Sequence, residues 1–183
     1  RTPRGGNAKP LDAADVSALR ELMDKSGFGP LVAHAPYTMN LCSAKAETVE
    51  FARRAMAEDL ERMESLPGNY YNFHPGSHVK QGADKGIELI CKGLNQVLVA
   101  GQSTRVLLET MAGKGTEVGR TFEELARIID GVGHDELLGV CLDTTPRTPW
   151  ARTRTATSAS ARAPWAPGPS RPLWASRGCP GFP

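Results

Sequence analysis

The sequence lacks any apolar run approaching the roughly 18–20 residues that span a membrane, and no secretory signal segment heads it. It also lacks a C-x-x-C pair, because its four cysteines stand far apart, at Cys42, Cys91, Cys141 and Cys179. We therefore expect reduced thiols in a cytoplasmic protein, not a disulfide framework or a membrane protein. The chain begins at Arg1 and not at Met, which leaves an upstream targeting segment open.

Acidic residues are missing from the last part of the chain. Every Asp and Glu lies at or before Asp143, whereas residues 145–183 contain six Arg and no Lys. Since the whole chain has a formal net charge of +2, residues 1–144 carry −4. An acidic body gives no general support to nucleic-acid binding, although local basic loops can still contact phosphates.

Residues 145–183 also have a single large aliphatic residue, Leu173, and eight of the chain's fourteen prolines. A segment of this composition buries too little apolar surface to offset the entropy of ordering it. We therefore expect a folded domain over residues 1–144 and a disordered tail over residues 145–183. The abrupt change of composition at Thr145 is typical of a shifted reading frame.

Four short apolar segments each end in a polar residue. These end residues are His34, His74, Glu109 and Asp143, which lie 40, 35 and 34 positions apart. A helical pattern fills each gap, and a strand with its return helix takes about 30 residues or more, so the spacing predicts successive parallel βα units. Side chains at the carboxyl ends of neighbouring parallel strands converge on one mouth.

The apolar spacing predicts helices at residues 12–25, 46–66, 83–100 and 122–130. In the first helix, the apolar stripe consists of Val16, Leu19, Leu22 and Met23. Before the last helix, Thr121 and Glu124 form a capping box. The expected fold class is therefore α/β, with about four parallel βα units.

Two imidazoles and two carboxylates at one mouth favour a metal site. His34, His74 and Glu109 would leave an open position for water or substrate, as His/His/Glu sets do in catalytic zinc sites. Manganese stays open as the metal. A central carboxylate such as Glu109 can bridge to a second ion on Asp143, and paired ions suit phosphodiester hydrolysis. His78 lies in the loop after His74. It either orients a metal ligand or is a loop residue without a role at the site.

Each of these residues, taken alone, is more often a satisfied polar group or a helix cap than a ligand. The hypothesis therefore depends on the recurrence of such residues in four consecutive units.

The segments around these residues resemble signature segments of the endonuclease IV family. The resemblance covers about residues 1–144, through residues 34–41 (HAPYTMNL), 72–78 (NFHPGSH), 109–115 (ETMAGKG) and 139–144 (GVCLDT). The family consists of zinc-dependent endonucleases for apurinic/apyrimidinic sites, built on a (β/α)₈ TIM barrel. The resemblance therefore implies a partial TIM barrel that holds the middle four of eight βα units.

The resemblance also implies roles for single residues. His34, His74 and Glu109 would bind one zinc, and Glu109, as the catalytic bridging carboxylate, would share a second zinc with Asp143. The family site holds two or three zinc ions, of which this chain would hold at most a partial set.

The implied partner is double-stranded DNA containing abasic sites. Tyr37 would lie in the minor groove beside the abasic nucleotide, and Arg4 would belong to a DNA-contacting loop. The implied reaction hydrolyses the phosphodiester 5′ to the abasic site and leaves a 3′-hydroxyl. The family resemblance further implies a monomer.

The chain departs from the family pattern at Pro146, which stands where a further zinc ligand is expected. The segments that carry the remaining ligands and the outer strands are absent from the sequence, so we expect little or no nuclease activity from this chain. Two alternatives stay open, namely a metal-dependent sugar isomerase or epimerase of the same barrel type, and a non-catalytic fragment or partner-binding half-barrel.

Overall fold

The computed structural model describes residue 2 and residues 6–144 of the 183-residue chain. Arg4, Pro146 and the tail expected at residues 145–183 lie outside the described residues. Among the described helices, none is long and apolar enough to cross a membrane.

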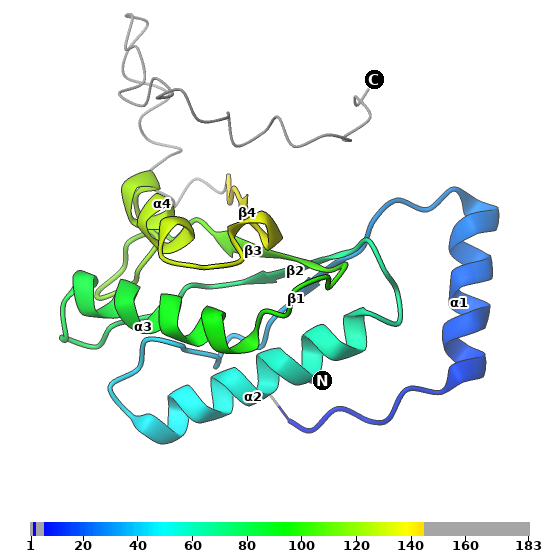
Figure 1. The fold of residues 1–183 in the computed structure, drawn as a ribbon, viewed down its shortest axis with the longest axis horizontal. Helices are drawn as coiled ribbons and strands as arrows, with labels where there is room; N and C mark the ends of the chain where they lie inside the picture. Colours follow the sequence, from blue (N-terminus) through cyan, green and yellow to red (C-terminus); the bar gives the residue numbers. More distant parts are fainter. Residues whose placement is uncertain (1, 3–5, 145–183) are drawn as a thin grey trace, which may run out of the picture.

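Four parallel strands form a single sheet in the order β1-β2-β3-β4 (Figure 1). The strands are β1 (Val32–His34), β2 (Tyr70–Phe73), β3 (Arg105–Glu109) and β4 (Leu138–Cys141). The helices are α1 (Ala13–Ser26), α2 (Ala46–Met63), α3 (Ala83–Val97), α4 (Phe122–Asp130) and the short 3₁₀ helix η1 (Asp135–Leu137). Each pair of neighbouring strands is joined through one α-helix, which confirms the predicted run of parallel βα units, a partial α/β barrel.

The core lies between the sheet and the layer formed by α2, α3 and α4, in which neighbouring helices contact each other. Because successive strand residues point to opposite faces, Tyr71 and Phe73 of β2 lie on the helix side with Val106 and Leu108 of β3. All four are buried, together with the inward residues of the three helices, such as Met56, Ile90, Leu94 and Ile128. The opposite face of the sheet carries the polar residues that end the strands.

Helix α1 forms where the sequence predicts it, because the Asp12 carboxylate accepts the backbone N–H groups of Ala14 and Asp15. Gly27, with φ of +58°, ends the helix in the left-handed conformation. However, none of the residues of α1 is buried. Leu19 and Leu22 of its apolar stripe are exposed, Leu22 to 61%, whereas Val16 and Met23 are half-buried. Figure 1 shows the reason, since α1 stands to one side of the sheet.

Helix α2 ends at Met63, three residues before the predicted end. The next residue, Glu64, forms side-chain hydrogen bonds outside the helix. Its carboxylate accepts the backbone N–H and the hydroxyl of both Ser103 and Thr104, at 2.7 to 2.9 Å. Burial alone would raise the pKa of Glu64, but these hydrogen bonds from Thr104 and Ser103 outweigh it and lower the pKa to about 2. Glu64 thereby ties the end of α2 to the start of β3.

We predict that Glu64→Gln lowers the free energy of unfolding by about 1 kcal/mol at pH 7, because an amide oxygen cannot accept all four hydrogen bonds. The native pKa is depressed, so this contribution is complete above the ordinary carboxyl value of 4.5 and is lost as the pH falls towards about 2. Urea unfolding at pH 7 and pH 3 measures the difference, with Glu61→Gln on the exposed side of α2 as control. An equal loss of stability at both pH values would contradict the assignment.

Candidate metal centre

His34, His74 and Glu109 reach one point from three neighbouring strands. His34 is the last residue of β1, Glu109 is the last residue of β3, and His74 directly follows β2. Because parallel strands present their carboxyl ends at the same edge of a sheet, the three side chains converge there. One potential ligand atom from each residue lies within 4.8 Å of the other two.

Glu109 lies between the two histidines, and each of its carboxylate oxygens contacts a different imidazole. Its Oε2 lies 3.1 Å from His34 Nε2, and its Oε1 lies 3.6 Å from His74 Nε2. The two imidazole rings meet edge to face, with centroids 5.0 Å apart and an interplanar angle of 85°. The Glu109 side chain is 16% exposed and that of His34 is 46% exposed, so the group is open to solvent on the imidazole side.

The hydrogen bond of His34 to its neighbour determines which ring nitrogen faces the carboxylate. His34 Nδ1 lies 2.7 Å from the carbonyl oxygen of Ala35, which can only accept, so Nδ1 carries a proton. In the neutral ring, the lone pair of Nε2 then points at Glu109 Oε2, which also only accepts. Two facing lone pairs need a positive charge between them, either a second imidazole proton or a cation. A ring whose other N–H is held by a backbone carbonyl is the usual arrangement of metal-binding histidines, so these residues fit a divalent cation.

Asn72 also contacts this group, although sequence reasoning did not single it out as a site residue. Its Nδ2 donates to Glu109 Oε2 at 2.5 Å, and the residue is only 4% exposed. The sequence could have indicated Asn72 through the alternation of side chains along a strand, which places it on the same face of β2 as His74.

Asp143 follows β4 by two residues and is not one of the three clustered ligands. Its backbone N–H donates to Thr110 Oγ1 at 2.9 Å, which fixes it beside the end of β3. Burial, followed by the negative charges of Glu109 and Asp143, raises the pKa of the Cys141 thiol. The negative charges of both carboxylates therefore disfavour the thiolate form of Cys141, which is a free thiol.

Neither His78 nor Tyr37 belongs to the group of three ligand residues. His78 accepts the backbone N–H of Gly82 through Nδ1 at 3.1 Å, at the start of α3, and this contact points its ring towards the helix. Tyr37 is 59% exposed in the loop after β1. It lines a pocket of about 490 Å³ with His34, and the lining includes neither His74 nor Glu109.

Asn40 joins the loop after β1 to the loop after His74. Its Nδ2 donates to the carbonyl of Ser77, and its Oδ1 accepts the backbone N–H groups of Cys42 and Ser77. Gly76, with φ of +122°, lets the two loops approach, since a Cβ there would lie 2.3 Å from Asn40 Oδ1. These contacts keep the main chain that follows His74 in place.

The loop after His74 is also paired with the loop after β3. Ser77 forms an antiparallel bridge with Glu117, and its hydroxyl lies 2.6 Å from the hydroxyl of Thr116. The backbone N–H of Val118 donates to the carbonyl of Gly76 at 2.9 Å. The loops that follow the first three strands therefore form one hydrogen-bonded unit around the cluster.

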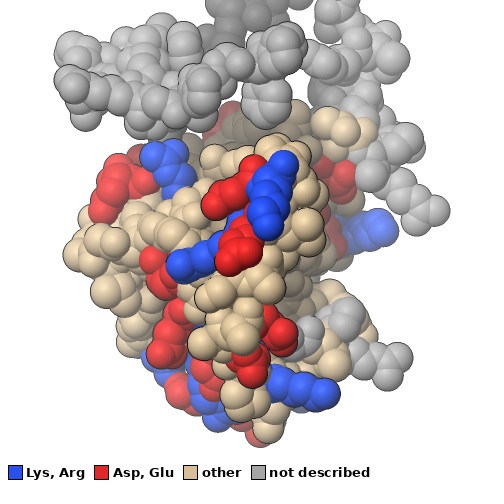
Figure 2. Space-filling model, turned by 90° about the vertical axis from the view of Figure 1, so that its right-hand side faces the viewer, with Lys and Arg blue, Asp and Glu red and all other residues tan. Residues whose placement is uncertain are grey.

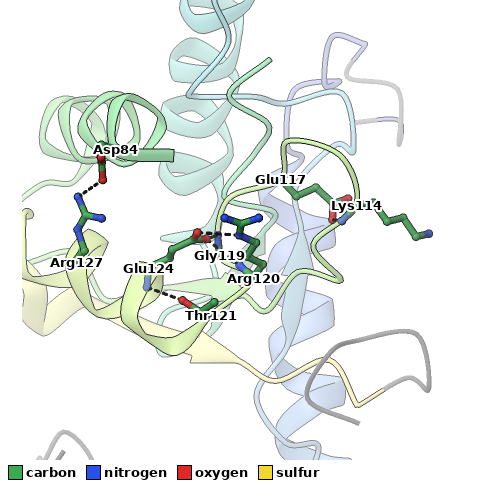
Figure 3. A network of polar contacts seen from close by, with 8 residues as sticks. All are labelled: Asp84, Lys114, Glu117, Gly119, Arg120, Thr121, Glu124 and Arg127. Carbon is green, nitrogen blue, oxygen red and sulfur yellow. Dashed lines mark hydrogen bonds and ion pairs between the residues drawn. The ribbon is translucent and has the colours of Figure 1, made fainter. Parts of the chain in front are cut away.

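The start of α4 differs from the predicted capping box (Figure 3). Thr121 Oγ1 accepts the N–H of Glu124 as expected. The Glu124 carboxylate, however, accepts the N–H groups of Gly119 and Arg120 and the Nε–H of Arg120, at 2.8 to 3.1 Å. The prediction of a reciprocal bond to Thr121 was wrong, because the turn at Gly119 brings these donors closer. Arg120 is held by this ion pair, whereas the Lys114 side chain points away from the network.

The face seen in Figure 2 carries no single large patch of basic side chains among the described residues. The described acidic and basic side chains are interspersed on that face. Attraction of a polyanion to it would therefore depend on individual side chains.

Comparisons with known proteins match the four-strand architecture. The xylose isomerase-like TIM barrel family matches residues 1–145. Over 144 residues, the chain is 59% identical to a probable endonuclease 4 of Akkermansia muciniphila and 56% identical to one of Alkaliphilus oremlandii. These alignments cover 79% of this chain and 52% and 51% of the relatives. The chain therefore spans about half the length of the curated relatives it matches.

Two solved structures extend the comparison. Endonuclease IV from Thermus thermophilus superposes with a TM-score of 0.65 and 36% identity, over 79% of this chain and 50% of that one. A D-tagatose 3-epimerase-like protein superposes with a TM-score of 0.60 over 72% of this chain and 51% of that one, but its 20% identity shows the fold alone. The chain belongs to the xylose isomerase-like TIM barrel family and, within it, to the endonuclease IV family.

Proposed function

We propose that His34, His74 and Glu109 hold a zinc ion in an endonuclease that acts on DNA at abasic sites. The observation that carries the proposal is the convergence of the three residues, since one potential ligand atom of each lies within 4.8 Å of the other two. Nitrogen and oxygen ligands without a thiolate suit zinc, and three protein ligands leave a position open for the reaction. The names of the relatives, probable endonuclease 4 and endonuclease IV, support the reaction class.

The reaction that we propose is hydrolysis of the phosphodiester 5′ to the abasic site, which leaves a 3′-hydroxyl. Zinc, when bound, supplies Lewis-acid activation of water and neutralises developing charge on phosphate oxygens. Glu109 keeps its carboxylate between the two imidazoles, and Ala35 keeps the His34 ring oriented through its carbonyl. Asp143, whose backbone is held beside the end of β3 by Thr110, would supply a carboxylate to a second ion together with Glu109.

Double-stranded DNA with an abasic site is the substrate that we propose. Turning the abasic nucleotide out of the helix costs less than for a paired base, which favours such a site. Tyr37 is exposed next to His34, so its ring can contact the nucleotide that enters the mouth. The role of Arg4 in a DNA-contacting loop, a role for His78 beside the ligands and the monomeric state remain predictions.

We predict that the 183-residue chain binds Zn²⁺ and that His74→Ala and Glu109→Gln each weaken the affinity at least tenfold, because each removes one ligand. His134→Ala is the matched control, since its imidazole contacts Glu136 away from the cluster. Competition with a chromogenic chelator measures the affinities. Equal affinities for the wild type and both ligand variants would refute the proposed site.

The DNA reaction is tested in a chimera, since the proposed ligands of this chain are only part of the ligand set that the resemblance implies. Residues 6–144 replace the matching half of Thermus thermophilus endonuclease IV. We expect zinc-dependent incision of an abasic duplex, with 3′ ends that a polymerase extends, and at least a 100-fold loss in the Glu109→Gln chimera.

The same chimera is offered a ketose as the control substrate, because sugar 3-epimerases share this fold. Epimerisation of the ketose, or a folded zinc-loaded chimera without incision, would contradict the proposal. Incision by the 183-residue chain alone is expected to be slow or absent.

A further inference from the structure

Asn72 is a buried polar residue in the middle of a parallel strand, a position where apolar side chains are usual. It is 4% exposed, and its backbone pairs with His34 on one side and Leu107 on the other. A buried amide lowers stability unless its polar atoms are hydrogen-bonded. The presence of Asn72 therefore calls for a contact that an apolar residue cannot make.

That contact is with Glu109. Asn72 Nδ2 donates to Glu109 Oε2 at 2.5 Å, whereas Asn72 Oδ1 is buried with no partner among the described residues. Turning the amide over would direct Oδ1 at the carboxylate oxygen, two acceptors against each other, so the hydrogen bond to Glu109 determines the orientation. The Oδ1 atom therefore stays without a hydrogen bond among the described residues, while Nδ2 makes the contact with Glu109.

The donor from Asn72 differs from the other contacts of Glu109 because a metal does not remove it. The remaining contacts come from Nε2 of His34 and Nε2 of His74. Once these nitrogens give their lone pairs to a cation, neither can donate a proton to Glu109. Asn72 Nδ2 carries its own hydrogens and can keep one on Oε2 with the metal bound.

We propose that Asn72 is a positioning residue that holds Glu109 Oε2 so that the carboxylate presents its free lone pairs to the metal. This inference rests on the proposed zinc site. A carboxylate ligand is commonly held by such a hydrogen bond, and loss of the partner typically weakens metal affinity about 10- to 100-fold. The amide of Asn72 acts through Glu109 and does not itself coordinate.

The test measures zinc affinity and metal-free stability on the same variants of the full chain. Asn72→Leu keeps the volume, removes the donor and replaces the unpartnered oxygen with apolar atoms. We expect its zinc affinity to fall 10- to 100-fold, while the urea midpoint of the metal-free chain stays the same or rises. Asn72→Ala gives the same comparison of affinity should the leucine variant fail to fold.

Asn69→Ala is the matched control, because Asn69 has the same 4% exposure and directly precedes the start of β2, away from the metal centre. Its amide accepts the N–H of Leu31 and donates to the carbonyl of Leu66. We expect this variant to lose stability and to keep its zinc affinity within twofold. A structural role of Asn72 alone would make its variants behave in the same way as Asn69→Ala.

The outcomes separate this inference from the proposed function. Wild-type zinc affinity in Asn72→Leu or Asn72→Ala, together with weakened binding in Glu109→Gln, would overturn the positioning role and leave the metal site intact. No effect of Glu109→Gln would overturn both. Weak binding in the Asn72→Leu protein with undiminished metal-free stability would support the inference.

Discussion

The arrangement of Glu109 between two imidazoles depends on one electrostatic constraint. The carbonyl of Ala35 accepts the Nδ1–H of His34, so a neutral ring turns the lone pair of Nε2 towards the Glu109 carboxylate. Such a contact persists only with a positive charge between the atoms. The parallel sheet brings this constraint about, because it delivers His34, His74 and Glu109 to the same edge from three neighbouring strands.

The rest of the molecule keeps these strand ends in register. Helices α2, α3 and α4 cover one face of the sheet. The opposite face carries the polar residues of the strand ends beside apolar ones such as Leu107. Asn40 and Ser77 tie together the loops that leave the strand ends. Glu64, at the other end of the sheet, fixes α2 against the start of β3. The precision of the site therefore comes from contacts at both ends of the strands.

Much of this architecture follows from the sequence, because apolar runs that end in a polar residue are local signals. They gave the end of β3 at Glu109 and the three clustered residues, and helical apolar spacing gave the bounds of α4. The hydrogen bonds of Glu64 were missed because its partners lie about 40 residues later in the chain. The reciprocal cap of α4 failed for a local geometric reason, and the role of Asn72 became visible only once β2 was paired with β3.

Zinc K-edge X-ray absorption of the chain loaded with one equivalent of Zn²⁺ tests the central claim most directly, because the spectrum identifies the atoms that surround the ion and distinguishes imidazole from thiolate ligands. A site formed by two imidazoles and Glu109 predicts only nitrogen and oxygen neighbours, at about 2.0–2.2 Å, with the outer-shell scattering of imidazole rings. A sulfur neighbour at about 2.3 Å, or a spectrum without imidazole, would contradict it.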